Sequence, residues 1–249
     1  MIYVMSDIHG HSRRFQSILE QIDLQPEDTL YVLGDVIDRN PDGIRILRWL
    51  MSMPNVRLLL GNHELMMLES LYYDYADSER EKRLARWYRN GGAVTHQYLK
   101  HLRKSVRQEL FRFLDGLPVN LWVTVDERRF LLTHAAVAEV YQRFPDRYES
   151  EKQFAVWYRY SPEHRMEGDY TVIFGHTPTK HFSPTLPMEV WYGDGLLGID
   201  CGSAYSTPGS RLACLRLDDM KVFYSEENEC ALPDAPVEIR KKTPYNDKK

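Results

Sequence analysis

The first 60 residues alternate short apolar runs with amphipathic segments. Three apolar runs have the length and the residue types of buried strands, and each leads into a turn that contains glycine: 2–5, 30–33 and 56–60. Between them, apolar residues recur at helical spacing, first at Phe15, Ile18, Leu19 and Ile22, and then, after Pro41, which should open the helix, at Ile44, Leu47 and Met51. This order predicts a βαβαβ unit with right-handed crossovers.

Beyond Glu64 the pattern becomes helical and then rich in strands. Residues 65–117 are predicted to form a helical insertion with a break at 90–92, lying over the strand ends like a cap. Further strands are predicted at 119–125, 130–133, 170–174, 197–200, 211–217 and 222–225. We expect residues 1–233 to form a single domain and residues 234–249, which contain proline and lysine, to form a flexible tail.

Composition narrows the class of protein. With 249 residues, of which 43% are hydrophobic, the chain can bury a sizeable core, which argues against collagen-like, disordered and disulfide-framework proteins. The net charge of -4, from 32 basic and 36 acidic residues, argues against a dedicated nucleic-acid binder. Cys201, Cys214 and Cys230 form no Cys-x-x-Cys pair and fit a reducing compartment. Without a signal-type or membrane-length apolar segment, a soluble cytoplasmic protein is expected.

Five of the predicted strands end in residues that can bind a metal ion. These residues are Asp7 and His9 after the first strand, Asp35 and Asn62 after the next two, and His134 and His176 after the strands at 130–133 and 170–174. In open α/β sheets, ligands bind just outside the carboxyl ends of the strands. Carboxylate, imidazole and amide groups without thiolates suit a pair of divalent ions such as Mn, Fe or Zn better than calcium. Asp35 is the natural bridge, because a carboxylate offers one oxygen to each ion.

Four motifs carry a resemblance to a known family. They read SDIHG at 6–10, GDVIDR at 34–39, GNHE at 61–64 and GHT at 175–177. This set resembles the calcineurin-like metallophosphoesterases, and the pair Asp38-Arg39 resembles their phosphoprotein phosphatase branch, which includes phage lambda-type phosphatases and symmetrical dinucleoside tetraphosphate hydrolases. The resemblance covers roughly residues 1–205. It implies an α/β fold, a four-layer α/β/β/α sandwich with two mixed sheets inside, helices outside and the catalytic loops along one edge.

The resemblance also implies a role for each motif residue. The first metal ion would be held by Asp7, His9 and Asp35, and the second by Asp35, Asn62, His134 and His176. A water that bridges two divalent cations loses a proton near neutral pH and can attack phosphorus directly, so no protein nucleophile is needed. His63 would be the general acid, oriented by Asp38, and Arg39 would bind the phosphoryl oxygens.

A second arginine is expected between the last two histidine motifs. The segment Trp157-Tyr158-Arg159 resembles the Trp-x-Arg of phage-type members, which favours Arg159 over Arg143, Arg147 and Arg165. Two positions depart from the family pattern, because Ser6 and Asn40 stand where glycine is usual. Asparagine tolerates a positive φ better than most residues, so only small backbone adjustments are expected. The remaining histidines are predicted to be structural: His96, His101, His164 and His181.

The insertion leaves two interpretations of its basic and aromatic residues open. Residues 80–107 contain one acid, Glu81, and nine basic residues: Arg80, Lys82, Arg83, Arg86, Arg89, Lys100, Arg103, Lys104 and Arg107. This local charge of +8 either forms a solvated helix face or draws in polyanions. The aromatic residues in and before this segment either pack against the sheet or stack a nucleobase: Tyr72, Tyr73, Tyr75, Trp87 and Tyr88.

Two substrates therefore compete for the same predicted chemistry. The compact chain and its Trp-x-Arg slightly favour a serine/threonine protein phosphatase, which is the main hypothesis. The basic insertion favours the alternative, a symmetrical dinucleoside tetraphosphate hydrolase. A third hypothesis is a metal-bound scaffold that binds phosphorylated partners without turnover, but the complete set of ligands and acid residues argues against it. The expected partners are thus a phosphorylated protein or a dinucleoside polyphosphate, with no stable nucleic-acid complex and no membrane.

Overall fold

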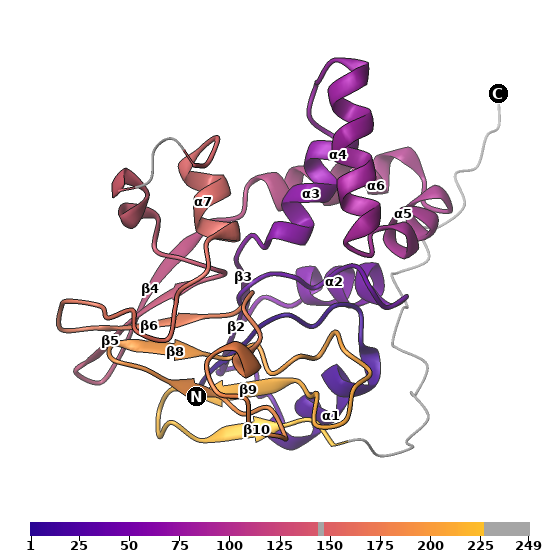
Figure 1. The fold of residues 1–249 in the computed structure, drawn as a ribbon. Coiled ribbons are helices and arrows are strands. Elements are labelled where there is room, and N and C mark those ends of the chain that lie inside the picture. The colour runs from indigo at the N-terminus through magenta and orange to yellow at the C-terminus, as the bar shows by residue number, and fades with distance from the viewer. Residues whose placement is uncertain (144–146, 227–249) are drawn as a thin grey trace.

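Two mixed β-sheets form the centre of the molecule (Figure 1). The computed structural model describes residues 1–143 and 147–226. The first sheet has the order β10-β9-β1-β2-β3 and consists of β1 (Ile2–Met5), β2 (Thr29–Val32), β3 (Val56–Leu58), β9 (Ala213–Arg216) and β10 (Val222–Tyr224). The second has the order β4-β5-β6-β8-β7 and consists of β4 (Asn120–Val125), β5 (Arg128–Thr133), β6 (Thr171–Phe174), β7 (Trp191–Tyr192) and β8 (Leu196–Gly198).

The predicted βαβαβ unit is confirmed. Strands β1, β2 and β3 pair in parallel, and the connections between them are α1 (Ser12–Ile22) and α2 (Gly43–Ser52). The prediction that Pro41 opens the second helix was wrong, because the chain is still turning at Pro41 and Asp42 takes the N-cap position. The first helical residue, Gly43, lies so close to the preceding turn that a Cβ there would be 2.7 Å from Ile37 Cα.

Alternation along the strands divides the buried side chains into layers. On β1, Val4 points into the core between the two sheets, whereas Tyr3 and Met5 point into the core under the helices. On β5, Leu132 belongs to the core between the sheets, and Leu131 packs with Phe154 on the outer face of the second sheet. The four-layer α/β/β/α arrangement is therefore confirmed. In the described residues, the layer over the second sheet contains one α-helix, the short α7 (Glu151–Trp157).

The predicted insertion contains four helices. They are α3 (Asn62–Leu71), α4 (Asp77–Arg89), α5 (Ala93–Lys100) and α6 (Lys104–Asp115), and the predicted break falls between α4 and α5. The first of these helices begins at Asn62, a few residues before the predicted start of the insertion. Leu68, Trp87, Leu99 and Leu114 join the core formed by α1, α2 and the first sheet. Figure 1 shows α3 to α6 gathered beyond α2, so these helices extend the outer helical layer.

Two of the three cysteines, Cys201 and Cys214, are buried free thiols. The third, Cys230, and the expected tail at 234–249 lie outside the described residues. Within the described residues, no helix combines the length and the apolar character needed to cross a bilayer.

The basic residues of α4 are largely occupied by carboxylates from outside the basic segment. The Arg83 side chain, only 9% exposed, forms ion pairs with Glu69 at 3.0 Å, Glu79 at 3.0 Å and Glu149 at 3.2 Å. Arg86 lies 3.8 Å from Glu69 and stacks over the Trp157 ring at 4.5 Å. These two arginines therefore hold the insertion together and are not free to attract a polyanion.

Replacing Arg83 with alanine is expected to destabilise the fold. Because the substitution leaves the buried Glu69 short of its partner, the free energy of unfolding should fall by about 3 kcal/mol. For a domain of this size that loss corresponds to a melting temperature lower by roughly 6 to 10 °C, measurable by calorimetry. The matched control is Arg80→Ala on the same helix, whose exposed ion pairs are worth about 0.5 kcal/mol or less. Equal effects of the two substitutions would contradict a buried role for Arg83.

Candidate active site

The loops after the strands turn through left-handed backbone at the predicted site residues. Positive φ values occur at Asp7 (53°), His9 (49°), Asp35 (53°), Asp38 (71°), Arg39 (68°) and His176 (61°). Such conformations are uncommon for residues other than glycine and persist only where the surroundings hold them, typically at functional sites. Asn40, expected to absorb a positive φ, does not have one. The turn instead falls on the two residues before it.

Glu64 anchors the second of these loops. Its buried carboxylate accepts hydrogen bonds from the backbone N–H groups of Asp35 (2.8 Å), Val36 (2.9 Å) and Ile37 (3.3 Å). A carboxylate that accepts three N–H groups fixes the path of the backbone, and here it fixes the direction of the Asp35 side chain. Glu64 is part of the third motif, but nothing in the pattern of that motif indicates this role.

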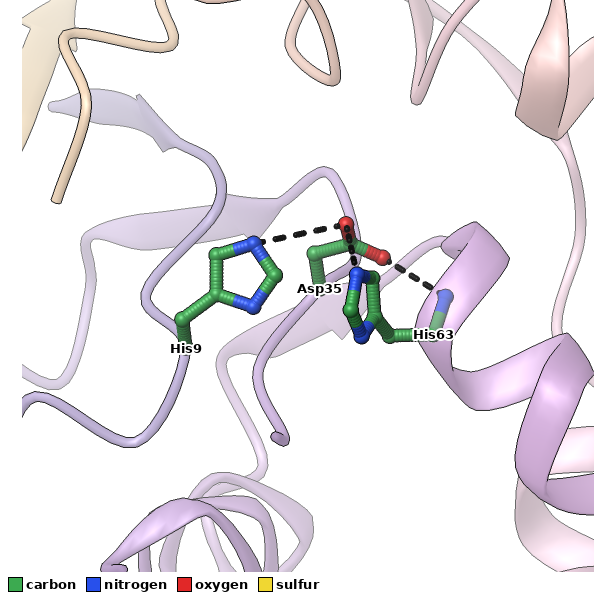
Figure 2. Close-up of side chains that lie close together, drawn as sticks. All are labelled: His9, Asp35 and His63. Carbon is green, nitrogen blue, oxygen red and sulfur yellow. Dashed lines mark hydrogen bonds and ion pairs between the residues drawn. The ribbon is translucent and has the colours of Figure 1, made fainter. Parts of the chain in front are cut away.

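Asp35 lies between two groups of histidines. Its Oδ2 atom is 3.6 Å from His9 Nε2 and 3.9 Å from His63 Nε2, and Figure 2 shows a nitrogen of each ring directed at this one oxygen. Its Oδ1 atom is 3.5 Å from His134 Nε2 and accepts a hydrogen bond from the His63 backbone N–H at 3.0 Å. The two oxygens of Asp35 thus face two different sets of nitrogen atoms, which is the arrangement that a bridging ligand requires.

The second set of potential ligands converges on Asn62. Its Oδ1 atom lies 3.0 Å from His134 Nε2 and 2.9 Å from His176 Nδ1. The three side chains come from α3 and from the loops after β5 and β6, so both sheets contribute to the cluster. Asp35, His134 and His176 present ligand atoms within 4.8 Å of one another, as do His9, Asp35 and His63. Asp35 belongs to both groups.

Asp7 is held by the first and the last motif together. Its Oδ2 atom accepts hydrogen bonds from the Ser6 hydroxyl and from the His176 backbone N–H, the latter at 2.9 Å. Its Oδ1 atom remains directed at the site, 3.8 Å from His9 Nε2. A Cβ at Gly175 would lie 2.0 Å from Ser6 Oγ and 2.2 Å from Asp7 Oδ2, so only glycine fits at this point. Ser6, which departs from the family pattern, therefore supports Asp7.

Each of three histidines uses one ring nitrogen to contact a backbone carbonyl. The distances are 3.0 Å from His9 Nδ1 to the Ile37 oxygen, 2.7 Å from His134 Nδ1 to the Leu33 oxygen and 3.2 Å from His176 Nε2 to the Trp157 oxygen. Because a carbonyl can only accept, these nitrogens carry the protons. The opposite nitrogen of each ring is left with a free lone pair facing the cluster, as in metal-binding histidines.

Burial makes this cluster suited to divalent cations. All six predicted ligands are buried. Burial raises the pKa of the Asp7 and Asp35 carboxyls well above its usual range and lowers the pKa of His9 and His176 well below the usual range of imidazole. Neutral imidazoles are the form that binds metal, and a nearby cation would stabilise the two carboxylates. The residues present therefore fit a pair of metal ions.

A histidine–aspartate pair adjoins the cluster. His63 Nδ1 donates to Asp38 Oδ2 at 2.7 Å, and the guanidinium of Arg39 lies 3.3 Å from His63 Nε2. Burial raises the pKa of Asp38 to about 7, although the hydroxyl of Thr95 and the indole of Trp87 oppose the shift. The predicted acid, its orienting carboxylate and the predicted phosphate-binding arginine are thus brought together beside Asp35.

A cavity of about 470 Å³ opens onto the cluster. Arg39 and Arg159 both line it, and Arg159 donates to the His176 carbonyl at 3.2 Å. Of the alternatives to Arg159, Arg165 is ion-paired with Asp194 and Arg147 is exposed, and neither lines the cavity. For Arg143, the side chain lies outside what the structure describes.

Sequence reasoning missed part of the cavity wall. The additional lining residues include Asp200, Trp157, Tyr160, His181, Phe182 and Tyr205. Asp200 follows β8 and had the same signal as the predicted ligands, a carboxylate at the end of an apolar run. His181 was expected to be structural but lies on the wall, while His96 contacts Trp87 and Tyr88 inside the insertion. Trp157 belongs to the Trp-x-Arg segment but was not itself assigned to the site, whereas Tyr160, Phe182 and Tyr205 had no local pattern that could have revealed them.

Residues 1–199 match the calcineurin-like phosphoesterase family. The chain belongs to this family. The family match supports a metal-dependent hydrolase, and it does not favour the third hypothesis, a scaffold without turnover, against which the motif residues already argue.

Named relatives of this phosphoesterase match it over limited stretches. One stretch of 85 residues is 39% identical to the symmetrical bis(5'-nucleosyl)-tetraphosphatase of Erwinia tasmaniensis and covers 33% of this chain and 31% of that enzyme. Over 69 residues, the chain is 41% identical to the enzyme of the same name from Chromobacterium violaceum, covering 27% of this chain and 25% of the relative. The matches thus span less than a third of the length of these relatives.

Solved structures share the fold over most of the chain. A protein described as "a putative diadenosine tetraphosphatase" superimposes with a TM-score of 0.55 at 17% identity, covering 91% of this chain and 94% of the other. A cold-active protein-tyrosine phosphatase of a psychrophilic Shewanella gives a TM-score of 0.51 at 15% identity, covering 90% and 80%. At these identities the likeness supports the fold of the phosphoesterase and does not select its substrate.

Proposed function

We propose that this phosphoesterase hydrolyses symmetrical dinucleoside tetraphosphates between the two central phosphates. The observation that carries the proposal is the cavity beside Asp35, which combines two arginines with several aromatic rings. Arginines suit the phosphate chain, and aromatic rings suit a nucleobase. The names of the relatives, which are symmetrical tetraphosphatases, support the same substrate.

The proposed ligands of the metal pair are those that the motifs predicted. Asp7, His9 and Asp35 would hold one divalent ion, and Asp35, Asn62, His134 and His176 would hold the other. The ions would supply an acidified water and neutralise charge on the phosphoryl oxygens. We propose manganese, with iron or zinc as alternatives, because the donor set mixes carboxylate, amide and imidazole groups.

The side chains around this centre have separate proposed roles. Arg39 and Arg159, on the cavity wall, would hold the phosphoryl oxygens, whose negative charge must be matched in the transition state. His63, hydrogen-bonded to Asp38, would give a proton to the oxygen that leaves phosphorus. Asp38 accepts the Nδ1 proton of His63 and turns Nε2 toward Asp35, so the proton that His63 would give up is one carried on Nε2 in the imidazolium form.

Base recognition is proposed to come from the cavity wall and not from the helical insertion. Phe182 lines the cavity with its ring stacked on Trp191 at a centroid distance of 4.4 Å, which makes it a rigid platform. Tyr205 lines it as well, with Lys180 over its ring at 4.5 Å. Trp87, in contrast, is completely buried inside the insertion. The aromatic residues that support a nucleotide substrate therefore lie between residues 157 and 205, and not in the helical insertion.

A serine/threonine protein phosphatase is the second candidate. The Trp-x-Arg segment still favours this candidate, because Arg159 lines the cavity. A phosphorylated side chain would use the same centre and the same arginines, but it would make no use of the aromatic wall. The two substrates therefore differ in their dependence on Phe182.

The two candidates are separated by product analysis of the Mn-reconstituted protein. Diadenosine tetraphosphate should yield two molecules of ADP faster than a phosphoserine peptide yields phosphate. Phe182→Ala should raise the KM for the tetraphosphate roughly tenfold, because a stacked base contributes about 1–3 kcal/mol, and should leave p-nitrophenyl phosphate hydrolysis unchanged. Predominant peptide turnover with an inert tetraphosphate would replace the proposal with the second candidate. Release of ATP and AMP would refute symmetrical cleavage.

A further inference from the structure

The turn between α4 and α5 of the helical insertion contacts the active site at the strained pair Asp38-Arg39. These two residues have consecutive positive φ values of 71° and 68°. A left-handed conformation at two successive residues other than glycine costs free energy, and the surrounding structure must supply the contacts that hold it. Residues of α4, α5 and the turn between them supply such contacts.

Three hydrogen bonds connect the insertion to this pair. The Asp38 backbone N–H donates to Thr95 Oγ1 at 3.0 Å, and the Arg39 backbone N–H donates to the Gly91 carbonyl at 3.1 Å. The indole Nε1–H of Trp87 donates to Asp38 Oδ2 at 2.7 Å. Trp87 and Thr95 are buried, so water does not compete for these bonds.

Two glycines allow the insertion to come this close. A Cβ at Gly91 would lie 2.9 Å from Arg39 Cγ, and a Cβ at Gly92 would lie 2.3 Å from Trp87 Nε1. The indole of Trp87 is in turn stacked on His96 with a centroid distance of 5.7 Å and an interplanar angle of 28°. The two glycines at the break between α4 and α5 therefore let the turn pack directly against Asp38-Arg39, and the contacts with Gly92 and His96 hold the plane of the indole.

We propose that Trp87 is a positioning residue for the Asp38–His63 pair, and that Gly91 and Thr95 hold the backbone of the same loop. Asp38 Oδ2 receives the N–H groups of both His63 and Trp87, each at 2.7 Å. Trp87 thus decides the rotation of the carboxylate and, through it, the direction of the His63 ring. The inference rests on the proposed role of His63 as the proton donor.

Trp87→Phe tests this role, because phenylalanine keeps an aromatic ring but lacks the N–H group. A buried hydrogen bond to a charged group is worth enough to lower kcat on an alkyl phosphate roughly tenfold, with KM within about twofold because substrate binding is untouched. Hydrolysis of p-nitrophenyl phosphate should change little, since its leaving group needs no proton. Tyr88→Phe, which removes a hydroxyl on the same helix that is hydrogen-bonded to His96, is the matched control and should show no larger loss on the alkyl phosphate than on p-nitrophenyl phosphate.

A double-mutant comparison separates positioning from loss of structure. In a His63→Asn background, Trp87→Phe should cause no further loss on the alkyl phosphate, because the group through which it acts is gone. Should Trp87→Phe lose activity equally on both substrates, or add its full effect in that background, the positioning role is refuted.

Thr95 provides an independent test should Trp87→Phe fold poorly. Thr95→Ser keeps the hydroxyl that accepts from the Asp38 backbone N–H, so this variant should retain activity on the alkyl phosphate and on p-nitrophenyl phosphate. Thr95→Val has the same shape but no hydroxyl, so it should lose more activity on the alkyl phosphate than on p-nitrophenyl phosphate. Identical behaviour of the two variants would refute the inference. A split in His63→Asn without one in Trp87→Phe or Thr95→Val would refute the inference and leave the proposed function standing. If the unaltered protein cleaves neither phosphate esters nor diadenosine tetraphosphate, both fail.

Discussion

Asp35→Asn is expected to lower the turnover of p-nitrophenyl phosphate by about three orders of magnitude, because it removes a group shared by two ligand sets. Asp35 Oδ2 faces His9 and His63, and its Oδ1 faces His134. An amide keeps the size of the side chain but exchanges one oxygen for an NH2 group, which cannot bind a cation. One of the two sets therefore loses its carboxylate.

The loss should be visible without an activity assay. After reconstitution with Mn and removal of excess ions, elemental analysis should find fewer than two equivalents bound to the variant. Added Mn should raise its melting temperature less than that of the unaltered protein, since a ligand stabilises the native state in proportion to its affinity. Asp219→Asn, at an exposed carboxylate paired with Arg216, is the matched control. Two bound equivalents with near-normal turnover would sink the assignment of Asp35 as the bridge.

His63→Asn is expected to separate substrates by their leaving groups. General acid catalysis contributes about 10²–10⁴-fold, so kcat on an alkyl phosphate should fall by that range, while p-nitrophenyl phosphate should lose roughly tenfold or less. The physical reason is that an alkoxide must be protonated to leave, whereas p-nitrophenolate is stable as an anion. The measurement is kcat on both esters across the two proteins.

Asp38→Asn serves as the companion to this variant. Asparagine can still contact His63 but no longer carries a charge, so the split between the esters should persist in weaker form. A uniform loss on both esters in His63→Asn would mean that the imidazole acts on the shared phosphoryl group and not on the leaving oxygen. In that case the proton donor has to be sought elsewhere on the cavity wall.

Local patterns were sufficient to predict that these polar side chains lie together. Asp7, Asp35 and Asn62 each follow a short apolar run, and parallel pairing of β1, β2 and β3 places such ends at one edge of the sheet. His134 and His176 follow strands of the second sheet in the same way. The same reasoning, applied consistently, would have included Asp200 after β8.

Contacts between distant segments could not be predicted from these patterns. The Trp87–Asp38 hydrogen bond joins residues 49 positions apart, and the Arg83–Glu149 ion pair joins residues 66 positions apart. A count of charges along the chain shows arginines in the insertion but not the carboxylates that fold against them. For this reason the basic segment seemed available for a polyanion, whereas the structure uses Arg83 and Arg86 internally.

The bond between Asp7 and the His176 backbone spans 169 positions of the chain, and the contact between Asn62 and His176 spans 114. Closing such long loops costs entropy before the contacts can form, which places them late in folding. A polypeptide still emerging from the ribosome therefore has the first three motifs long before it has a complete centre. High affinity for cations should therefore appear only in the last step of folding. Because the bound ions would contact residues from both sheets, they should slow the separation of the two sheets during unfolding.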